Sequence, residues 1–78
     1  TIGRDKSNTI CINDRFMSKF HARIIYDEGM YFLEDLNSAN GTYLNDEKIG
    51  DAIELKSQDI IKMGQVQFLF VDGDEDAK

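Results

Sequence analysis

The chain has 78 residues, of which 41% are hydrophobic, and it carries a net charge of −6 at pH 7. This length allows one small domain, and the hydrophobic fraction is too high for a disordered chain. The acidic balance argues against general nucleic-acid binding and against binding to anionic membranes, because both need a positively charged surface.

Short stretches that favour β-strands follow one another along the chain, with turns between them. Gly29 and Gly64 lie in two short turns that read as hairpins, and Gly29 is free to adopt a positive φ angle. No segment has the apolar spacing of a helix over three turns, so we predict an all-β sandwich or barrel whose core spans residues 1–71. The predicted strands cover residues 9–12, 20–26, 30–36, 42–44, 53–55, 60–63 and 66–71.

Alternation along the strands predicts which side chains are buried. In the last strand Phe68 and Phe70 share one face, while Leu69 and Val71 share the other, so we expect both faces of this strand to be covered. Cys11 lies in the first predicted strand, and we expect it to be a small buried residue without a disulfide partner.

The remaining features concern the ends of the chain. Residues 72–78 form an acidic run that we predict to be a disordered tail. No apolar run is long enough to span a membrane as a helix, and no signal peptide is visible, although the sequence begins at Thr1 without a methionine. We therefore expect a cytoplasmic protein, or a nuclear one if the source is eukaryotic.

Three polar segments carry groups that can hold an anion. Ser18 and Lys19 offer a hydroxyl and an ammonium group just before a strand, and the loop at residues 37–42 offers an amide and backbone N–H groups. Arg4, after Gly3, adds a planar guanidinium group that can form two hydrogen bonds to a phosphate. We predict that these segments meet in space and hold a phosphate group on another protein.

The order and spacing of these motifs is similar to one family. Gly3-Arg4, the SKFHARI sequence at residues 18–24, the YFLEDL sequence at 31–36, the SANGTYLN sequence at 38–45 and the DIIKMG sequence at 59–64 together resemble the forkhead-associated (FHA) domain. The resemblance covers nearly the whole chain. It implies an antiparallel β-sandwich whose loops at one end bind phosphothreonine peptides, with a role in phosphorylation-dependent assembly and no catalysis.

The resemblance also implies roles for individual residues. Arg4, Ser18 and Lys19 would contact the phosphate, whose charge of about −1.5 to −2 needs several donors around one point. Asn40 would hold the peptide backbone, although Asn-Gly is also a common tight-turn pair and residues 40–42 also form a glycosylation sequon. Ala39 occupies a position where many members have Thr or Ser, which leaves its backbone N–H as the available donor.

Other residues of the pattern are expected to support or tune the site. Arg15 lies in the loop before Ser18, and we expect it to favour an acidic residue after the phosphothreonine. The supporting residues are Gly3, His21, Gly41 and Thr42. We predict no catalytic residue, metal or cofactor, because a Ser18–His21 pair lacks a third orienting group.

Two departures from the family pattern affect the fold. Members usually have two strands before the Gly-Arg pair, so the sandwich is seen here without its usual first strands, and exposed strand edges would allow homo-oligomers to form. Gln58 stands where Gly-Asp is usual, and we expect a strained turn there.

Rival functions remain open at this point. The main alternative is a scaffold or oligomerisation domain that binds protein partners independently of phosphate. A small β-barrel that binds nucleic acid is disfavoured by the acidic charge, and an enzyme is disfavoured by the lack of a paired acid and base.

Overall fold

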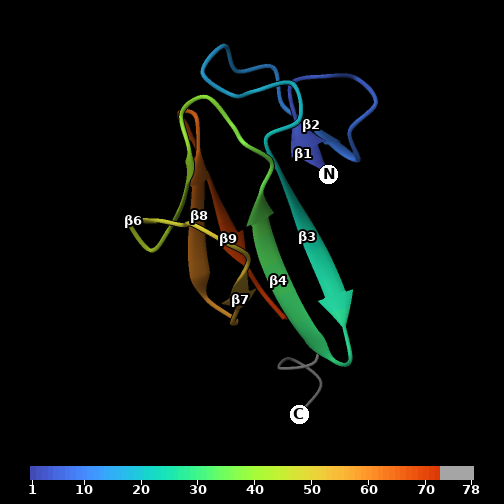
Figure 1. Cartoon of the computed structure of the whole chain (residues 1–78), viewed down its shortest axis with the longest axis vertical. Coiled ribbons are helices and arrows are strands. Elements are labelled where there is room, and N and C mark those ends of the chain that lie inside the picture. Colours follow the sequence, from blue (N-terminus) through green and yellow to red (C-terminus); the bar gives the residue numbers. More distant parts are fainter. Residues whose placement is uncertain (73–78) are drawn as a thin grey trace.

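The structure is a computed structural model that describes residues 1–72. Two β-sheets face each other, and long loops gather at one end (Figure 1). The first sheet has the strand order β2-β1-β3-β4-β7, and the second has the order β6-β5-β8-β9. All strand pairs are antiparallel except β1 with β2, which confirms the predicted all-β sandwich. The strands are β1 (Ile2–Gly3), β2 (Ile10–Cys11), β3 (Ala22–Asp27), β4 (Met30–Asp35), β5 (Thr42–Leu44), β6 (Glu47–Lys48), β7 (Ile53–Leu55), β8 (Asp59–Met63) and β9 (Val66–Phe70).

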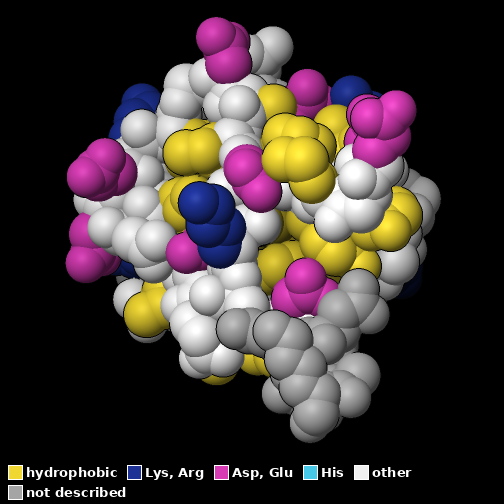
Figure 2. Space-filling view, turned by 90° about the horizontal axis from the view of Figure 1, so that it is seen from below, with side chains coloured by type: hydrophobic (Ala, Val, Ile, Leu, Met, Phe, Trp, Pro, Cys, Tyr) yellow, Lys and Arg dark blue, Asp and Glu magenta, His cyan; other side chains and the backbone are white. Residues whose placement is uncertain are grey.

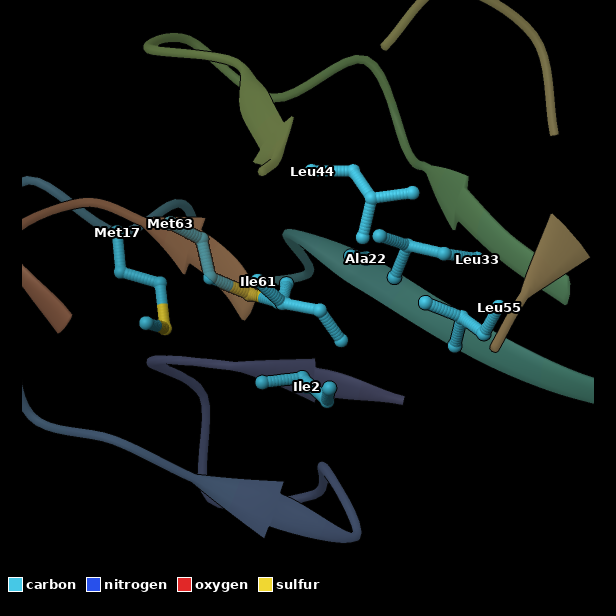
Figure 3. Packing of buried hydrophobic residues seen from close by; sticks show 8 residues of the cluster. All are labelled: Ile2, Met17, Ala22, Leu33, Leu44, Leu55, Ile61 and Met63. Carbon is cyan, nitrogen blue, oxygen red and sulfur yellow. The ribbon is translucent and has the colours of Figure 1, made fainter. Parts of the chain in front are cut away.

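The core lies between the two sheets, where the alternating apolar side chains of each sheet meet. Leu33 on β4 is paired with Ile24 on β3, and Leu44 on β5 is paired with Ile61 on β8. Leu33 is fully buried, so removing it from water contributes about 2 kcal/mol to folding. The core residues of Figure 3 are Ile2, Met17, Ala22, Leu33, Leu44, Leu55, Ile61 and Met63.

The turns behave as the sequence predicts. Gly29 and Gly64 both adopt positive φ angles, of 82° and 61°, in the β3–β4 and β8–β9 hairpins. Gln58 has a φ angle of 77°, which is unfavourable for a residue with a side chain, so the strained turn expected there is confirmed.

Two burial predictions are wrong. Leu69 is 58% exposed and Val71 is 45% exposed, because no described element covers the outer face of this sheet; Ile60, paired with Leu69 on the inner strand β8, is 46% exposed as well. Cys11 is also exposed, on the short strand β2. Side chains on a sheet face are buried only where a second layer covers that face.

Two strands, β1 and β6, were not predicted as strands, and residues 45–47 were expected to form only a turn. Each of these strands has two residues, which is too short to show alternation. Asp72, where the acidic tail was predicted to begin, donates its backbone N–H to Ser57 Oγ at 3.1 Å. The rest of the predicted tail, residues 73–78, lies outside the described residues.

The two ends of the sandwich differ in character. The loops that follow β1, β2 and β4 gather at one end, and the β3–β4 turn lies at the other (Figure 1). Seen from the end with the β3–β4 turn, patches of hydrophobic side chains lie between acidic side chains (Figure 2). Within residues 1–72 no helix has the length and apolarity needed to cross a bilayer.

Candidate functional site

The backbone after β1 is joined directly to the backbone around Ser18. Arg4 N donates to Ser18 O at 3.0 Å, and Asp5 N donates to Lys19 O at 3.1 Å. This close approach requires Gly3, because a Cβ atom there would lie 2.2 Å from Lys19 O. Segments that are 14 residues apart in the chain, at Arg4 and Ser18, are thereby held side by side.

Arg4 keeps most of its guanidinium group available. The side chain is exposed, and its Nε donates to Met17 O at 3.2 Å. A guanidinium group has five N–H donors, so the four on its two terminal nitrogens are left for an anion. The Met17 contact fixes the direction of the side chain while leaving this binding edge exposed.

Ser18 lies between two neighbouring loops. Its Oγ accepts a hydrogen bond from Ala39 N at 2.9 Å, and its backbone N–H donates to His21 Nδ1 at 3.0 Å. The hydroxyl hydrogen of Ser18 can therefore point toward an acceptor outside the chain. The Ala39 N–H, which we expected to be available to a phosphate, donates to Ser18 Oγ in this structure.

Asn40 faces the same segment from the other loop. Its Nδ2 donates to Phe16 O at 2.8 Å, and its Oδ1 makes no hydrogen bond within the described residues. Arg4 thus binds the carbonyl group of Met17, and Asn40 binds that of the adjacent residue, Phe16. Three of the predicted site residues, Arg4, Ser18 and Asn40, are brought together around residues 16–18.

Two more cations extend the positive character of this end. Lys19 and Arg15 are both exposed, and neither forms an ion pair with a described carboxylate. The Arg15 guanidinium lies over the Phe16 ring, with 4.9 Å between its Cζ atom and the ring centroid. Arg15 also lines an open groove of about 620 Å³ that continues to Gln65 and Val66. Arg15 forms no hydrogen bond to Arg4, Ser18 or Asn40 within residues 1–72, so it is not part of their hydrogen-bonded cluster.

His21 is hydrogen-bonded to both the loop of Ser18 and the loop of Asn40. The ring is fully buried, with Nδ1 accepting from Ser18 N and Nε2 lying 2.8 Å from Gly41 O. Because Nδ1 is an acceptor, Nε2 carries the proton and donates to Gly41 O, as in a neutral imidazole. One side chain therefore ties the Ser18 segment to the loop of Asn40.

Asp35 organises the loop that carries Asn40. Its carboxylate accepts from Ser38 N at 3.1 Å, from Ser38 Oγ at 2.5 Å and from Thr42 Oγ1 at 2.6 Å. Ser38 Oγ in turn accepts from Gly41 N at 3.0 Å. Partial burial raises the pKa of Asp35, but the hydrogen bonds from Ser38 and Thr42 outweigh it and hold the pKa below its ordinary value.

Sequence reasoning missed two supporting residues, Asn8 and Asp14. Asp14 accepts from Phe16 N at 2.8 Å and from Gln65 N at 2.9 Å, which joins its loop to the β8–β9 turn. These bonds lower the pKa of Asp14, the one from Phe16 having the larger effect. The signal in the sequence was an acidic residue two positions before Phe16, the spacing of an Asx turn. Asn8 gave no such signal.

Comparisons with known proteins agree with this geometry. The family model described as FHA domain matches residues 1–64. The protein FhaB of Mycobacterium tuberculosis is 33% identical over 64 residues, which cover 82% of this chain and 41% of FhaB. The chain spans only 8% of another relative, the ABC transporter ATP-binding/permease protein Rv1747 of the same organism.

Solved structures show the same fold. A structure described as an analysis of phosphothreonine-dependent FHA domain interactions has a TM-score of 0.83 at 31% identity, covering 87% of this chain and 70% of that chain. The structure of Mycobacterium tuberculosis EmbR with a low affinity phosphopeptide has a TM-score of 0.87 at 33% identity, covering 90% of this chain and 18% of EmbR.

Proposed function

This chain belongs to the FHA domain family, and we propose that it binds phosphothreonine peptides through the loops that carry Arg4, Ser18, Lys19 and Asn40. FHA domains are interaction modules rather than enzymes, and solved relatives hold phosphopeptides. For this chain we propose a role in phosphorylation-dependent protein assembly, with no catalytic step. The compartment we propose is one where protein kinases act, the cytoplasm or a nucleus.

One observation carries the proposal. Arg4 and Asn40 come from two different loops, yet both bind main-chain oxygens of the residues just before Ser18. Arg4 and Ser18 keep donors that the chain itself does not use, and Lys19 is exposed next to them. A doubly charged oxyanion needs such a set of donors around one point.

Each residue has a distinct proposed role. The two terminal nitrogens of Arg4 form charge-assisted hydrogen bonds to the phosphate, and Lys19 adds a point charge. Ser18 donates its hydroxyl hydrogen to a phosphate oxygen. If a phosphate oxygen takes the Ala39 N–H away from Ser18, that backbone group becomes a further donor.

Asn40 and Arg15 act on the peptide around the phosphothreonine. The free Oδ1 of Asn40 and its second N–H can pair with one peptide unit, which fixes the direction of the bound chain. Arg15, held over Phe16 beside the open groove, would favour an acidic residue after the phosphothreonine. A preference at that position remains a proposal to be tested with peptide libraries.

Titration calorimetry with three versions of one peptide tests the function. A phosphothreonine peptide should bind with a dissociation constant on the order of micromolar. Its unphosphorylated twin should not bind measurably. The phosphoserine version should bind up to about tenfold more weakly, because it lacks one methyl group.

A pair of arginine variants gives the control. Arg4→Ala should abolish phosphopeptide binding, because it removes the largest group of charge-assisted donors. Arg23→Ala, on β3, should leave binding unchanged, since Arg23 is exposed and is bound to Glu34 instead. Binding that is indifferent to the phosphate, or equal losses in both variants, would favour the alternative of a phosphate-independent scaffold.

A further inference from the structure

Asn8 is a buried polar residue in the loop between β1 and β2. Only 7% of its surface is exposed, although its neighbours Ser7 and Thr9 are exposed. A buried amide needs partners for its polar atoms, because each unpaired polar atom opposes folding. Its contacts therefore indicate what the residue does.

The side-chain amide of Asn8 joins the two segments that carry the site. Nδ2 donates to Asp5 O at 2.8 Å and to Lys19 O at 2.7 Å. Both N–H groups of the amide are thus used, one on each segment. The same Nδ2 lies 2.9 Å from the position that a Cβ atom of Gly3 would occupy, so the three segments are in close contact.

The two carbonyl groups that Asn8 binds each have a second, backbone donor. Asp5 O also accepts from the backbone N of Asn8, and Lys19 O also accepts from the backbone N of Asp5. Asn8 Oδ1, in contrast, is buried without a hydrogen-bond partner in residues 1–72. Loss of the Asn8 amide would leave both carbonyls with a backbone donor and would remove this unpaired oxygen, so the stability lost with the two hydrogen bonds should be limited.

We propose that Asn8 is a positioning residue for the phosphate-binding groups. Its amide holds the Lys19 carbonyl beside the turn after Arg4. The backbone positions that carry the Lys19 and Arg4 side chains are thereby fixed relative to each other. This inference rests on the proposed phosphothreonine function. The geometry required of binding groups is narrow, on the order of 0.5 Å, so a small backbone movement here reduces affinity.

The test combines binding with stability. Asn8→Leu replaces the amide by an apolar group of similar shape, and Asn8→Ala removes it. Both variants should lose about tenfold in affinity for the phosphothreonine peptide, which is the scale seen when a supporting partner of a binding group is removed. Both variants should remain folded at the temperature of the binding assay, because both carbonyls keep a backbone donor.

Thr9→Val serves as the matched control. Thr9 is the exposed neighbour of Asn8 and its side chain makes no hydrogen bond within the described residues, so this variant should bind normally. Amide hydrogen exchange adds a readout that does not need the peptide. Exchange at Asp5 N, which donates to Lys19 O, should become faster in both Asn8 variants and stay unchanged in Thr9→Val.

The outcomes separate this inference from the function on which it rests. Failure of the natural chain to bind any phosphopeptide would reject the function. Hydrogen exchange at Asp5 N that is no faster in the Asn8 variants than in the natural chain would independently reject the positioning role. If Asn8→Leu lowers the melting temperature while the folded fraction binds with unchanged affinity, Asn8 is only structural and the inference is overturned. The same result with Asn8→Ala would overturn it should the leucine variant not fold.

Discussion

Replacing His21 tests whether one buried ring holds the two loops of the site together. In His21→Ala, Ser18 N–H and Gly41 C=O both lose their partner, and the space of a fully buried ring is left empty. An unsatisfied buried group costs about 1–3 kcal/mol, with Ser18 at the lower end because it is half-buried. The emptied space costs about 1–2 kcal/mol more.

The free energy of unfolding should therefore fall by about 3–6 kcal/mol in His21→Ala, out of a total of about 4–12 kcal/mol for a domain of this size. Urea denaturation measures this change through the midpoint and slope of unfolding. Two conservative variants divide the effect. In His21→Asn the side-chain oxygen can replace Nδ1 and accept from Ser18, and in His21→Gln the side-chain amide can replace Nε2 and donate to Gly41.

Each conservative variant should therefore recover part of the loss. His21→Asn should keep the bond to Ser18 and lose that to Gly41, and His21→Gln should do the reverse. If both are as unstable as His21→Ala, the two hydrogen bonds do not contribute and only the packing of the ring matters. A His21→Ala variant as stable as the natural chain would refute the reasoning altogether.

Three further changes test the fold around the site. The hydrogen bonds that lower the pKa of Asp35 favour its charged form, so they contribute stability above about pH 4 that is lost as the pH falls through the lowered pKa of the folded state. Urea midpoints at pH 7 and pH 3 should therefore differ less in Asp35→Asn than in the natural chain. An equal difference in the two proteins would contradict this. Gly29→Ala and Gly41→Ala should each cost about 1 kcal/mol because φ is 82° and 84°, and the new Cβ at position 41 would meet only the flexible end of Lys48, whose Cε lies 2.9 Å away. A much larger loss of unfolding free energy in Gly41→Ala would show that Lys48 cannot move aside. Leu33→Ala should cost about 2–5 kcal/mol by calorimetry, since Leu33 is fully buried between the sheets, and a loss below 1 kcal/mol, roughly, would mean that the core collapses around it.

Much of the fold could be predicted because its longer strands alternate. The pairing of β3 with β4 and of β8 with β9 follows from the apolar residues at every second position and from Gly29 and Gly64 in the turns. Burial was harder to predict, because alternation does not tell which faces of a sheet are covered by another layer. Leu69 and Cys11 are apolar or weakly polar, yet both remain exposed.

The site could be predicted only in part for a related reason. Arg4, Ser18 and Asn40 were found through a motif that spans the chain, whereas their contacts with the main chain leave no pattern in the sequence. Any residue offers the carbonyl group that Arg4 or Asn40 binds. Asn8 was missed because an asparagine in a polar loop is ordinarily exposed, and only the fold shows that it is buried.

The attachment of Asn40 and Arg4 to main-chain oxygens also bears on how such a domain can change its partners. Met17 is constrained because its side chain fills the core, whereas Phe16, with 37% of its surface exposed, contributes its carbonyl group whatever its side chain is. Positions 15 and 16 can therefore vary without removing the carbonyl groups that hold Arg4 and Asn40 in place. If the proposed function holds, new peptide preferences can arise at these positions while the phosphate-binding residues stay constant.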